Sequence, residues 1–163
     1  GIGHIQVRGD NVFAGYWGLP DKTREEFTAD GFFRTGDMGR FDSEGYLAII
    51  GRDKDLIITG GLNVYPKEIE EAIDTLPGVA ESAVIGLPHP DFGEAVTAVV
   101  VRGRDASGLT AEGIIAALKG NIAGFKVPKA VHFVDDLPRN AMGKVQKNRL
   151  RERFGDAGKS QPP

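Results

Sequence analysis

Residues 51–70 read GRDKDLIITGGLNVYPKEIE, which begins with charged residues and continues into two short apolar segments. Residues 56–59 and 62–65 are rich in apolar and β-branched side chains, and only Gly60 and Gly61 separate them. Two glycines between such segments favour a tight turn of the hairpin type. The stretch therefore predicts a β-hairpin.

A helix is predicted directly after this hairpin. Pro66 suits its first turn, because proline lacks an N–H that the start of a helix does not use. The following apolar residues have helical spacing up to Pro77, namely Ile69, Ala72, Ile73 and Leu76. We therefore expect a helix with one buried face.

Further strands and a second helix are predicted beyond it. Residues 79–87 and 94–101 predict two strands, with a proline-rich loop at 88–93 that looks too long for a tight hairpin. Thr110 is expected to cap the second helix. Its apolar stripe is expected to end at Gly124 and consists of Ile114, Ile115, Leu118 and Ile122.

This order of elements predicts an α+β fold. We expect residues 54–154 to form a small, mobile mixed-sheet domain with two to three helices, in which 129–134 is the last strand. Residues 1–53 predict short strands and a helix at 20–27, too few elements for a complete domain. They are expected to be the β-rich, barrel-like end of a larger N-terminal domain. Residues 155–163 are rich in Gly, Ser and Pro and predict a disordered tail.

The composition excludes several classes of protein. The chain has 163 residues, 40% hydrophobic and 26% charged, and no cysteine, which excludes disulfides, cysteine-ligated zinc and a thiolate nucleophile. The longest apolar run, 95–101, is too short to span a membrane as a helix. The chain begins at Gly1 without a basic and apolar leader, so we expect a piece of a longer protein without a targeting signal.

Charge is distributed unevenly along the chain. Residues 126–154 hold eight Lys or Arg and three acidic residues, whereas the whole chain has a net charge of −3. This basic arm predicts contact with anionic ligands such as phosphates, and a solvated charged helix is the alternative interpretation. A non-catalytic nucleic-acid-binding module is a further alternative, but it would need interleaved aromatic side chains, and only Phe133 and Phe154 occur in this arm, with Phe125 just before it. We therefore expect no nucleic-acid partner.

Common catalytic motifs are absent from the sequence. His4, His89 and His132 lack metal-ligand spacing, no serine lies in a nucleophile elbow, and the glycines match neither a dinucleotide fingerprint nor a Walker loop. We expect no metal site built from this chain. The remaining polar motifs are RTGD at 34–37, expected between two strands, and GK at 143–144, expected in a flexible basic loop. Aspartate can accept hydrogen bonds from a ribose diol, and lysine can neutralise phosphate.

Together, the polar motifs resemble the C-terminal portion of the AMP-forming superfamily of acyl-CoA synthetases, adenylation domains and luciferases. The motifs that carry the resemblance are FRTGD at 33–37, GRDKDLII at 51–58, YPKEIE at 65–70 and LPRNAMGK at 137–144. The resemblance extends from Gly3 to about Arg153. Within the superfamily, PRNAMGKVQKN at 138–148 is most similar to malonyl-CoA synthetase or a related acid–CoA ligase.

The resemblance implies an ATP-dependent acid–CoA ligase, acting on malonate or a fatty acid, that forms an acyl-AMP and then an acyl-CoA thioester. It implies the cofactors ATP, coenzyme A and Mg²⁺, bound mainly by the missing N-terminal domain, so that the fragment alone is inactive. It also implies a cytoplasmic enzyme. An adenylation domain that delivers to a carrier protein is the second interpretation.

The resemblance also assigns roles to residues in the first part of the chain. It implies that Asp37 holds the ribose hydroxyls, that Arg52 contacts the same nucleotide, and that Ile49 packs near the adenine. Lys54 falls at the family's hinge, about which the small domain swings. Gly60 and Gly61 would line the pantetheine tunnel, where a Cβ would block close approach.

Lys144 falls at the position of the adenylation lysine, which bridges the acid carboxylate and the α-phosphate. Bringing two anions together builds negative charge, so a cation present there in the transition state is worth on the order of several kcal/mol. Acetylation would remove this charge. We therefore expect a lysine acetyltransferase and a deacetylase as regulatory partners acting on Lys144.

Overall fold

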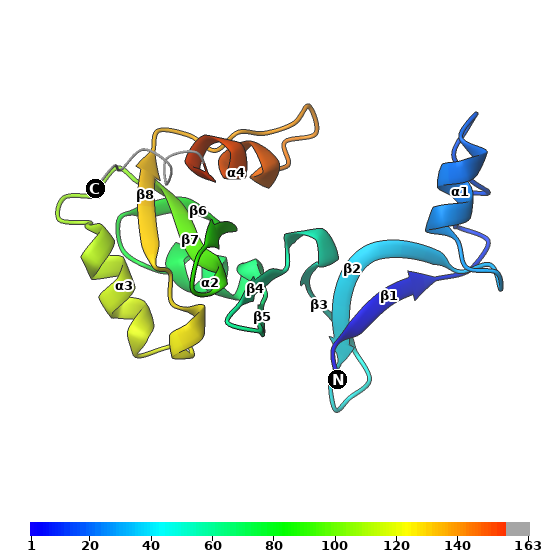
Figure 1. Ribbon diagram of the computed structural model, residues 1–163, viewed down its shortest axis with the longest axis horizontal. Coiled ribbons are helices and arrows are strands. Elements are labelled where there is room, and N and C mark those ends of the chain that lie inside the picture. Colours follow the sequence, from blue (N-terminus) through cyan, green and yellow to red (C-terminus); the bar gives the residue numbers. More distant parts are fainter. Residues whose placement is uncertain (156–163) are drawn as a thin grey trace. The chain divides into compact units, whose positions relative to one another are not determined.

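The computed structural model describes residues 1–155, and the expected tail from 156 onward lies outside the described residues. The chain divides into two compact units, Gly1–Lys54 and a second that begins at Asp55 (Figure 1). The first contains three strands and one helix, and residues 55–155 contain five strands and three α-helices. The α+β prediction is confirmed. Gly155 was wrongly assigned to the tail, because it ends the last helix.

The first unit is a three-stranded antiparallel sheet with the order β1-β2-β3. Its elements are β1 (Gly3–Val7), α1 (Pro20–Glu26), β2 (Phe33–Phe41) and β3 (Leu47–Arg52). The expectation that residues 34–37 lie between two strands is wrong, since they lie inside β2. Pairing with β1 and β3 carries the strand through Gly36, whose φ of +73° allows the local irregularity.

Aromatic side chains pack α1 and its preceding loop against the start of β2. Phe13 contacts Tyr16, Phe27 and Phe33 edge-on, with ring centroids 5.1–5.5 Å apart. Within residues 1–54, Met38 is the only hydrophobic side chain in the buried core. The far end of the sheet leaves Phe41 71% exposed. The first unit therefore does not cover its own apolar surface.

The second unit is a mixed sheet with the order β5-β4-β7-β6, and β8 pairs with β7 in parallel. Its strands are β4 (Ile57–Thr59), β5 (Leu62–Val64), β6 (Val79–His89), β7 (Gly93–Arg102) and β8 (Ala130–Val134). The hairpin predicted around Gly60 and Gly61 is confirmed as the antiparallel pair β4–β5. Both glycines have a positive φ, +56° and +78°, which this two-residue turn requires.

The link between β6 and β7 differs from the sequence prediction. The strands continue through Pro88 and His89, and His89 pairs with Gly93 across a three-residue loop. In the described residues, β7 is the one strand that pairs with β6, so β6 forms an edge of the sheet. An edge strand tolerates proline because one side of it makes no ladder hydrogen bonds. The long loop predicted at 88–93 is therefore wrong.

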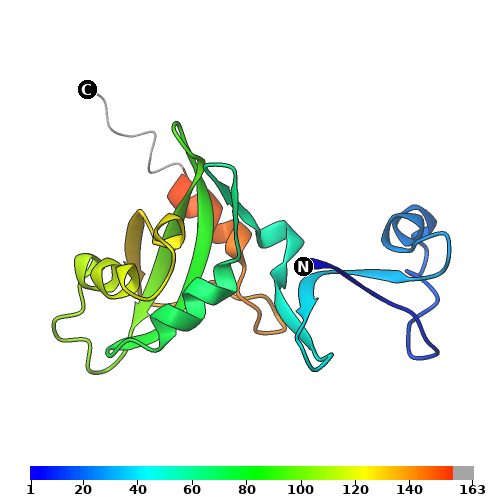
Figure 2. The same cartoon turned by 90° about the horizontal axis from the view of Figure 1, so that it is seen from below.

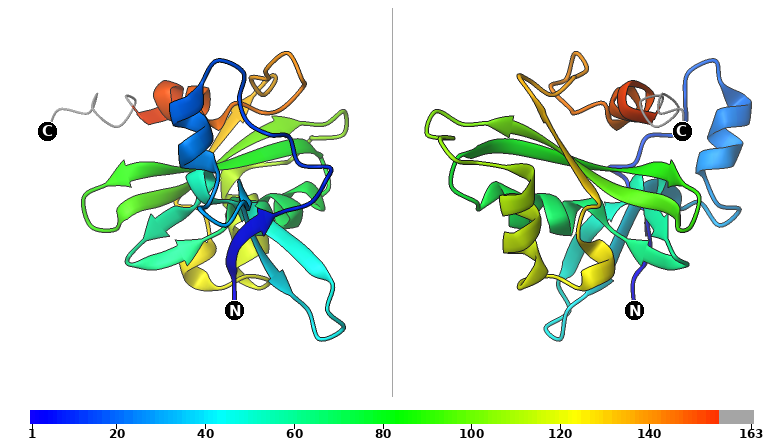
Figure 3. Two further views of the ribbon diagram at one scale, coloured as in Figure 1. Left: turned by 90° about the vertical axis from the view of Figure 1, so that its right-hand side faces the viewer. Right: turned by 60° about the vertical axis from the view of Figure 1, so that its left-hand side comes forward.

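Helices cover both faces of this sheet (Figures 2 and 3). They are α2 (Pro66–Asp74), α3 (Ala111–Lys119) and α4 (Lys147–Gly155). Because side chains alternate along a strand, Val84 of β6 packs in the core with α2 and α3, whereas Ile85 packs with α4. The sheet is thus the central layer.

The sequence located the start of α3 correctly but not its end. Thr110 Oγ1 accepts a hydrogen bond of 3.0 Å from the backbone N–H of Gly113, so the predicted cap is confirmed. The helix ends at Lys119 rather than Gly124, and Gly124 begins a short 3-10 turn. Ile122 packs against the core from outside the helix, which explains why it continues the apolar pattern.

Candidate functional site

Two of the predicted nucleotide-binding residues lie together in the first unit. Asp37 and Arg52 are paired across β2 and β3, and Nε of Arg52 lies 3.0 Å from Oδ1 of Asp37. Thr35 supports this arrangement, because its Oγ1 donates to the carbonyl of Ile5 and accepts the N–H of Asp37. The side chain of Asp37 is 23% exposed and that of Arg52 48% exposed, so both can still reach a ligand.

A cavity of about 300 Å³ adjoins this pair within the first unit. Its lining is mostly polar and consists of Tyr16, Glu26, Phe33, Arg34, Thr35, Gly36, Arg52, Asp53 and Lys54. Lys54, predicted as the hinge, therefore lies beside the nucleotide-binding candidates at the end of this unit. The sequence analysis did not identify Tyr16, which lies outside the recognised motifs, and it gave no role to Thr35 inside the motif at 33–37.

Ile49 is not among the residues that line this cavity. It lies on β3 opposite Gly39 and is 53% exposed. The structure therefore brings Asp37 and Arg52 together, and it does not place Ile49, the third predicted nucleotide contact, beside the same cavity.

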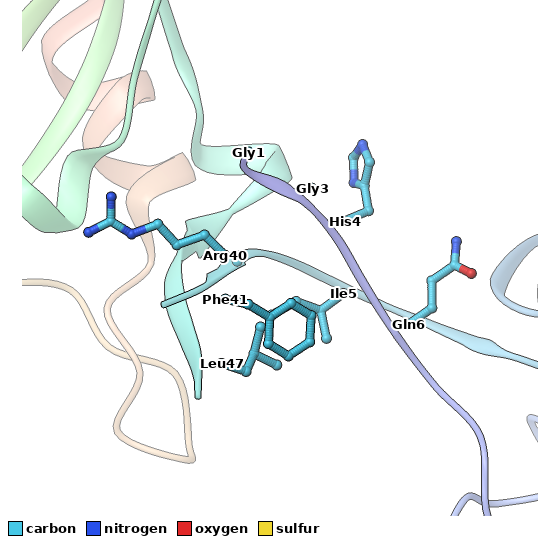
Figure 4. Close-up of a pocket in the computed structure, with 9 residues that line it drawn as sticks. Gly1, Gly3, His4, Ile5, Gln6, Arg40, Phe41 and Leu47 are labelled. Atoms are coloured by element: carbon cyan, nitrogen blue, oxygen red, sulfur yellow. The ribbon is translucent and has the colours of Figure 1, made fainter. Parts of the chain in front are cut away.

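A second cavity, of about 340 Å³, lies on the sheet of the first unit. In Figure 4, the side chains of Ile5, Phe41 and Leu47 gather together, whereas His4 and Gln6 point away from them. This apolar face, formed by Ile5, Phe41 and Leu47, was not found from the sequence. The available signal was the number of large apolar residues in a segment too short to bury them.

The predicted glycine pair lies on the β4–β5 turn of the second unit. The N–H of Gly60 donates to the carbonyl of Phe92 over 2.8 Å, which joins this turn to the β6–β7 loop. A Cβ at either glycine would meet nothing within 4 Å. The positive φ values are therefore a sufficient structural reason for two glycines, independent of any pantetheine contact.

Lys144 lies in the loop between β8 and α4, drawn in orange in Figure 1. The backbone of this loop is an ordered turn: Asn140 Oδ1 accepts the N–H groups of Met142 and Lys144 at 3.0 and 2.9 Å. The N–H of Asn140 in turn donates to the carbonyl of Lys144. Lys144 is exposed, and within the described part of its own unit its ammonium has no hydrogen-bond or ion-pair partner.

The sequence analysis did not predict two ion pairs around this loop, which involve four charged residues. They form the ion pairs Arg139–Glu81 and Lys147–Glu70. The partners are far apart in the sequence, so no local pattern indicates them. By contrast, the asparagine two residues before Met142 carried a readable signal for a side-chain-stabilised turn.

One histidine of the second unit has a perturbed acidity. Burial lowers the pKa of His132, since the protein interior disfavours the charged imidazolium. The His132 ring stacks on Phe154 of α4 with ring centroids 4.5 Å apart. This contact joins β8 to α4.

The described residues offer no cluster of three His, Asp or Glu side chains that could hold a metal ion. Among the helices of residues 1–155, none has the length and apolar character needed to cross a membrane.

Residues 68–144 match the family model described as the AMP-binding enzyme C-terminal domain. Over 150 residues the chain is 50% identical to the 3-[(3aS,4S,7aS)-7a-methyl-1,5-dioxo-octahydro-1H-inden-4-yl]propanoyl:CoA ligase of Rhodococcus jostii. It is 46% identical over 153 residues to the feruloyl-CoA synthase of an Amycolatopsis species. These alignments cover 92% and 94% of the chain but 29% and 31% of the relatives. The chain thus spans about 30% of the length of these curated relatives.

Solved structures of MatB from Rhodopseudomonas palustris are also similar. The ATP-bound structure is 60% identical with a TM-score of 0.90, and the apo structure is 61% identical with a TM-score of 0.70. Each match covers 96% of this chain and 31% of the solved chain.

Proposed function

We propose that this chain is the C-terminal part of an AMP-forming acid–CoA ligase, because residues 68–144 match the family model described as the AMP-binding enzyme C-terminal domain. The relatives described above are named as CoA ligases, in agreement with the resemblance of the sequence to acyl-CoA synthetases. In the proposed reaction, a carboxylate attacks the α-phosphate of ATP and pyrophosphate leaves. The thiol of coenzyme A then displaces AMP from the acyl-AMP.

The observation that carries this proposal is the exposed ammonium of Lys144, unpaired in its own unit, at the last residue matched by the family model. A lysine without an internal partner can offer its full charge to a ligand. The first half-reaction brings a carboxylate against a phosphate, and a cation aimed at both oxygens lowers that barrier. Lys144 would supply this cation in acyl-AMP formation and have no part in the transfer to coenzyme A.

Asp37 and Arg52 would bind the nucleotide from the first unit. The Asp37 carboxylate can accept hydrogen bonds from both ribose hydroxyls, and the ion pair with the adjacent guanidinium fixes its orientation. The remaining N–H groups of Arg52 can donate to phosphate. We further propose that Ile49, exposed on the neighbouring strand, packs near the adenine.

Lys54 is the proposed hinge between the two half-reactions. Support comes from the division of the chain into two compact units, the first of which ends at Lys54. A swing at this residue would exchange the Lys144 loop for the exposed turn of Gly60 and Gly61 at the acyl site. The backbone of that turn would then line the path of the pantetheine arm.

The remainder of the parent protein is the proposed partner of the first unit. Ile5, Phe41 and Leu47 form an apolar face that the first unit does not cover by itself, as expected for the end of a larger domain. That N-terminal domain would hold Mg²⁺ and most contacts to ATP and coenzyme A. This chain by itself would be inactive.

The substrate and regulation follow from the same assignment. We propose malonate or a fatty acid as the substrate, on the similarity of 138–148 to malonyl-CoA synthetases. Because ATP and coenzyme A are its co-substrates, we place the enzyme in the cytoplasm. Acetylation of the exposed Lys144 ammonium would switch off acyl-AMP formation, and mass spectrometry of enzyme that is acetylated yet fully active would contradict this.

The proposal is tested on the intact parent protein. We expect pyrophosphate release that requires ATP and a carboxylic acid, and thioester formation that requires coenzyme A in addition. Malonate, a long-chain fatty acid and ferulate are compared at equal concentration, and residues 1–163 alone serve as the inactive control. If the parent releases no pyrophosphate with any acid, or if residues 1–163 alone do so, the proposal fails.

A further inference from the structure

We propose that Lys147 and Arg139 are positioning residues for Lys144, because their ion pairs with Glu70 and Glu81 fix the loop that carries it. The inference rests on the proposed role of Lys144 in acyl-AMP formation. According to this inference, contacts within the second unit fix the position of the Lys144 ammonium.

The first anchor follows Lys144 in the sequence. Lys147 begins α4, and its Nζ lies 2.6 Å from Oε1 of Glu70 on α2. These side chains are only 16% and 19% exposed, so solvent screens the pair less than a surface ion pair. The same Glu70 oxygen accepts the N–H of Val84 over 2.8 Å. The start of α4 is therefore tied to the edge strand of the sheet.

The second anchor precedes Lys144. One guanidinium nitrogen of Arg139 pairs with Glu81 of β6, and the other donates to the carbonyl of Gly143 over 2.8 Å. Arg139 thus connects the sheet to the residue immediately before Lys144. Planar guanidinium groups fix geometry well when two of their nitrogens are used in this way.

The base of the loop is also held by Leu137 and Val145, which pack in the core beneath α4. The N–H of Gln146 there donates to the carbonyl of Pro138 over 2.7 Å. In the described part of the chain, the tip of the loop lacks such contacts. Met142 at its tip is 78% exposed, and Asn140 bonds only to residues of the loop itself. The Asn140 contacts give the turn its internal shape, whereas the two ion pairs relate that shape to the body of the unit. Loss of either ion pair should therefore leave Lys144 present but displace its ammonium from the position that the reaction needs. A misplacement of about 1 Å can reduce a rate about 100-fold.

The test is Lys147→Met in the intact parent, with Arg149→Gln as the control that removes one positive charge from the same helix. We expect kcat for acyl-AMP formation to fall about 10- to 100-fold. The KM for ATP and the transfer of preformed acyl-AMP to coenzyme A should change less than about threefold, as should every parameter of Arg149→Gln. Lys147→Arg should restore most of the lost rate, since it restores the ion pair.

A double variant distinguishes an effect on the position of Lys144 from an effect on the stability of the whole unit. In a Lys144→Ala background there is no ammonium to aim, so Lys147→Met should cause less than about a twofold further loss. An equal loss from Lys147→Met in both backgrounds would overturn the inference. If Lys147→Met does not fold, Glu81→Gln, which breaks the more exposed pair, carries the same expectations.

Different outcomes would reject the proposed function and the positioning role. If Lys144→Ala leaves acyl-AMP formation intact, the proposed function is wrong and the positioning role falls with it. If Lys144→Ala abolishes this step while Lys147→Met and Glu81→Gln proceed at the parental rate, only the positioning role is wrong.

Discussion

Arg52 and Asp37 face each other across β3 and β2, with Nε of the guanidinium 3.0 Å from Oδ1 of the carboxylate. Arg52 is half-exposed, and ion pairs with such solvent access contribute only about 0–1 kcal/mol to stability. This pair is therefore better explained as a preorganised polar site than as a support of the fold.

Asp37→Ala in the intact parent should raise the KM for ATP in acyl-AMP formation about tenfold, the cost of losing charge-assisted hydrogen bonds to the ribose. The melting temperature should stay within about 2 °C, because the half-exposed Arg52 lets solvent screen the ion pair. Asp21→Ala, which breaks the exposed pair with Arg24 on α1, is the control for loss of a surface charge. A large drop in melting temperature with an unchanged KM would instead identify Asp37 as structural.

Gly60→Ala should have two separable effects. The positive φ of +56° makes alanine strained there, and we expect the free energy of unfolding to fall by about 1–2 kcal/mol. Gly108→Ala, at a φ of +95° and equally free of neighbours, should cost a similar amount. Only Gly60→Ala should also slow thioester formation from preformed acyl-AMP. Equal rates for both variants in that assay would remove the pantetheine role and leave the turn alone as the reason for the glycine.

The stability of the chain should depend on pH through His132. Its pKa is lower in the folded protein than the ordinary 6.5, so the unfolded state binds a proton more readily. The stabilising contribution is complete above the unfolded pKa and is lost as the pH falls through the folded pKa. Urea unfolding of His132→Phe, which preserves ring stacking on Phe154, should show a smaller loss of stability than the parent between about pH 7 and pH 5. A change in this pH dependence for His4→Phe but not His132→Phe would contradict the assignment.

Local signals in the sequence predicted the elements that depend on local chemistry. Gly60 and Gly61 indicated a hairpin, and Thr110 marked the start of α3. Pro88 was misleading, because tolerance of proline depends on whether a strand lies at an edge, and that is a property of the assembled sheet. Gly124 was similarly mistaken for a helix end, since Ile122 packs on the core from outside the helix.

The candidate site shows the same division. The motifs indicated Asp37 and Arg52 as candidate nucleotide contacts. That the two residues form an ion pair follows from the β2–β3 register and not from the motifs. Glu81 lies 58 residues from Arg139, so their pairing required the fold. Contacts between distant residues cannot be derived from one sequence without its topology.

Lys54→Pro should separate the two half-reactions of the parent enzyme. Proline fixes φ near −65°, so a backbone that must change conformation at this residue would be held in one state. We expect acyl-AMP formation to remain measurable while thioester formation fails, because the second step needs Gly60 and Gly61 at the acyl site. Lys54→Ala removes the charge but keeps the backbone mobile, and it should support both steps. A folded proline variant with parental rates in both would refute the hinge.

The most direct test of the central claim is the rate of each half-reaction in Lys144→Ala of the intact parent, measured separately in single turnovers. We expect the rate of acyl-AMP formation to fall by a factor of about 10² to 10³ or more, with transfer from preformed acyl-AMP to coenzyme A nearly unchanged. Equal losses in the two half-reactions would contradict the assignment of Lys144 as the cation of the first step alone.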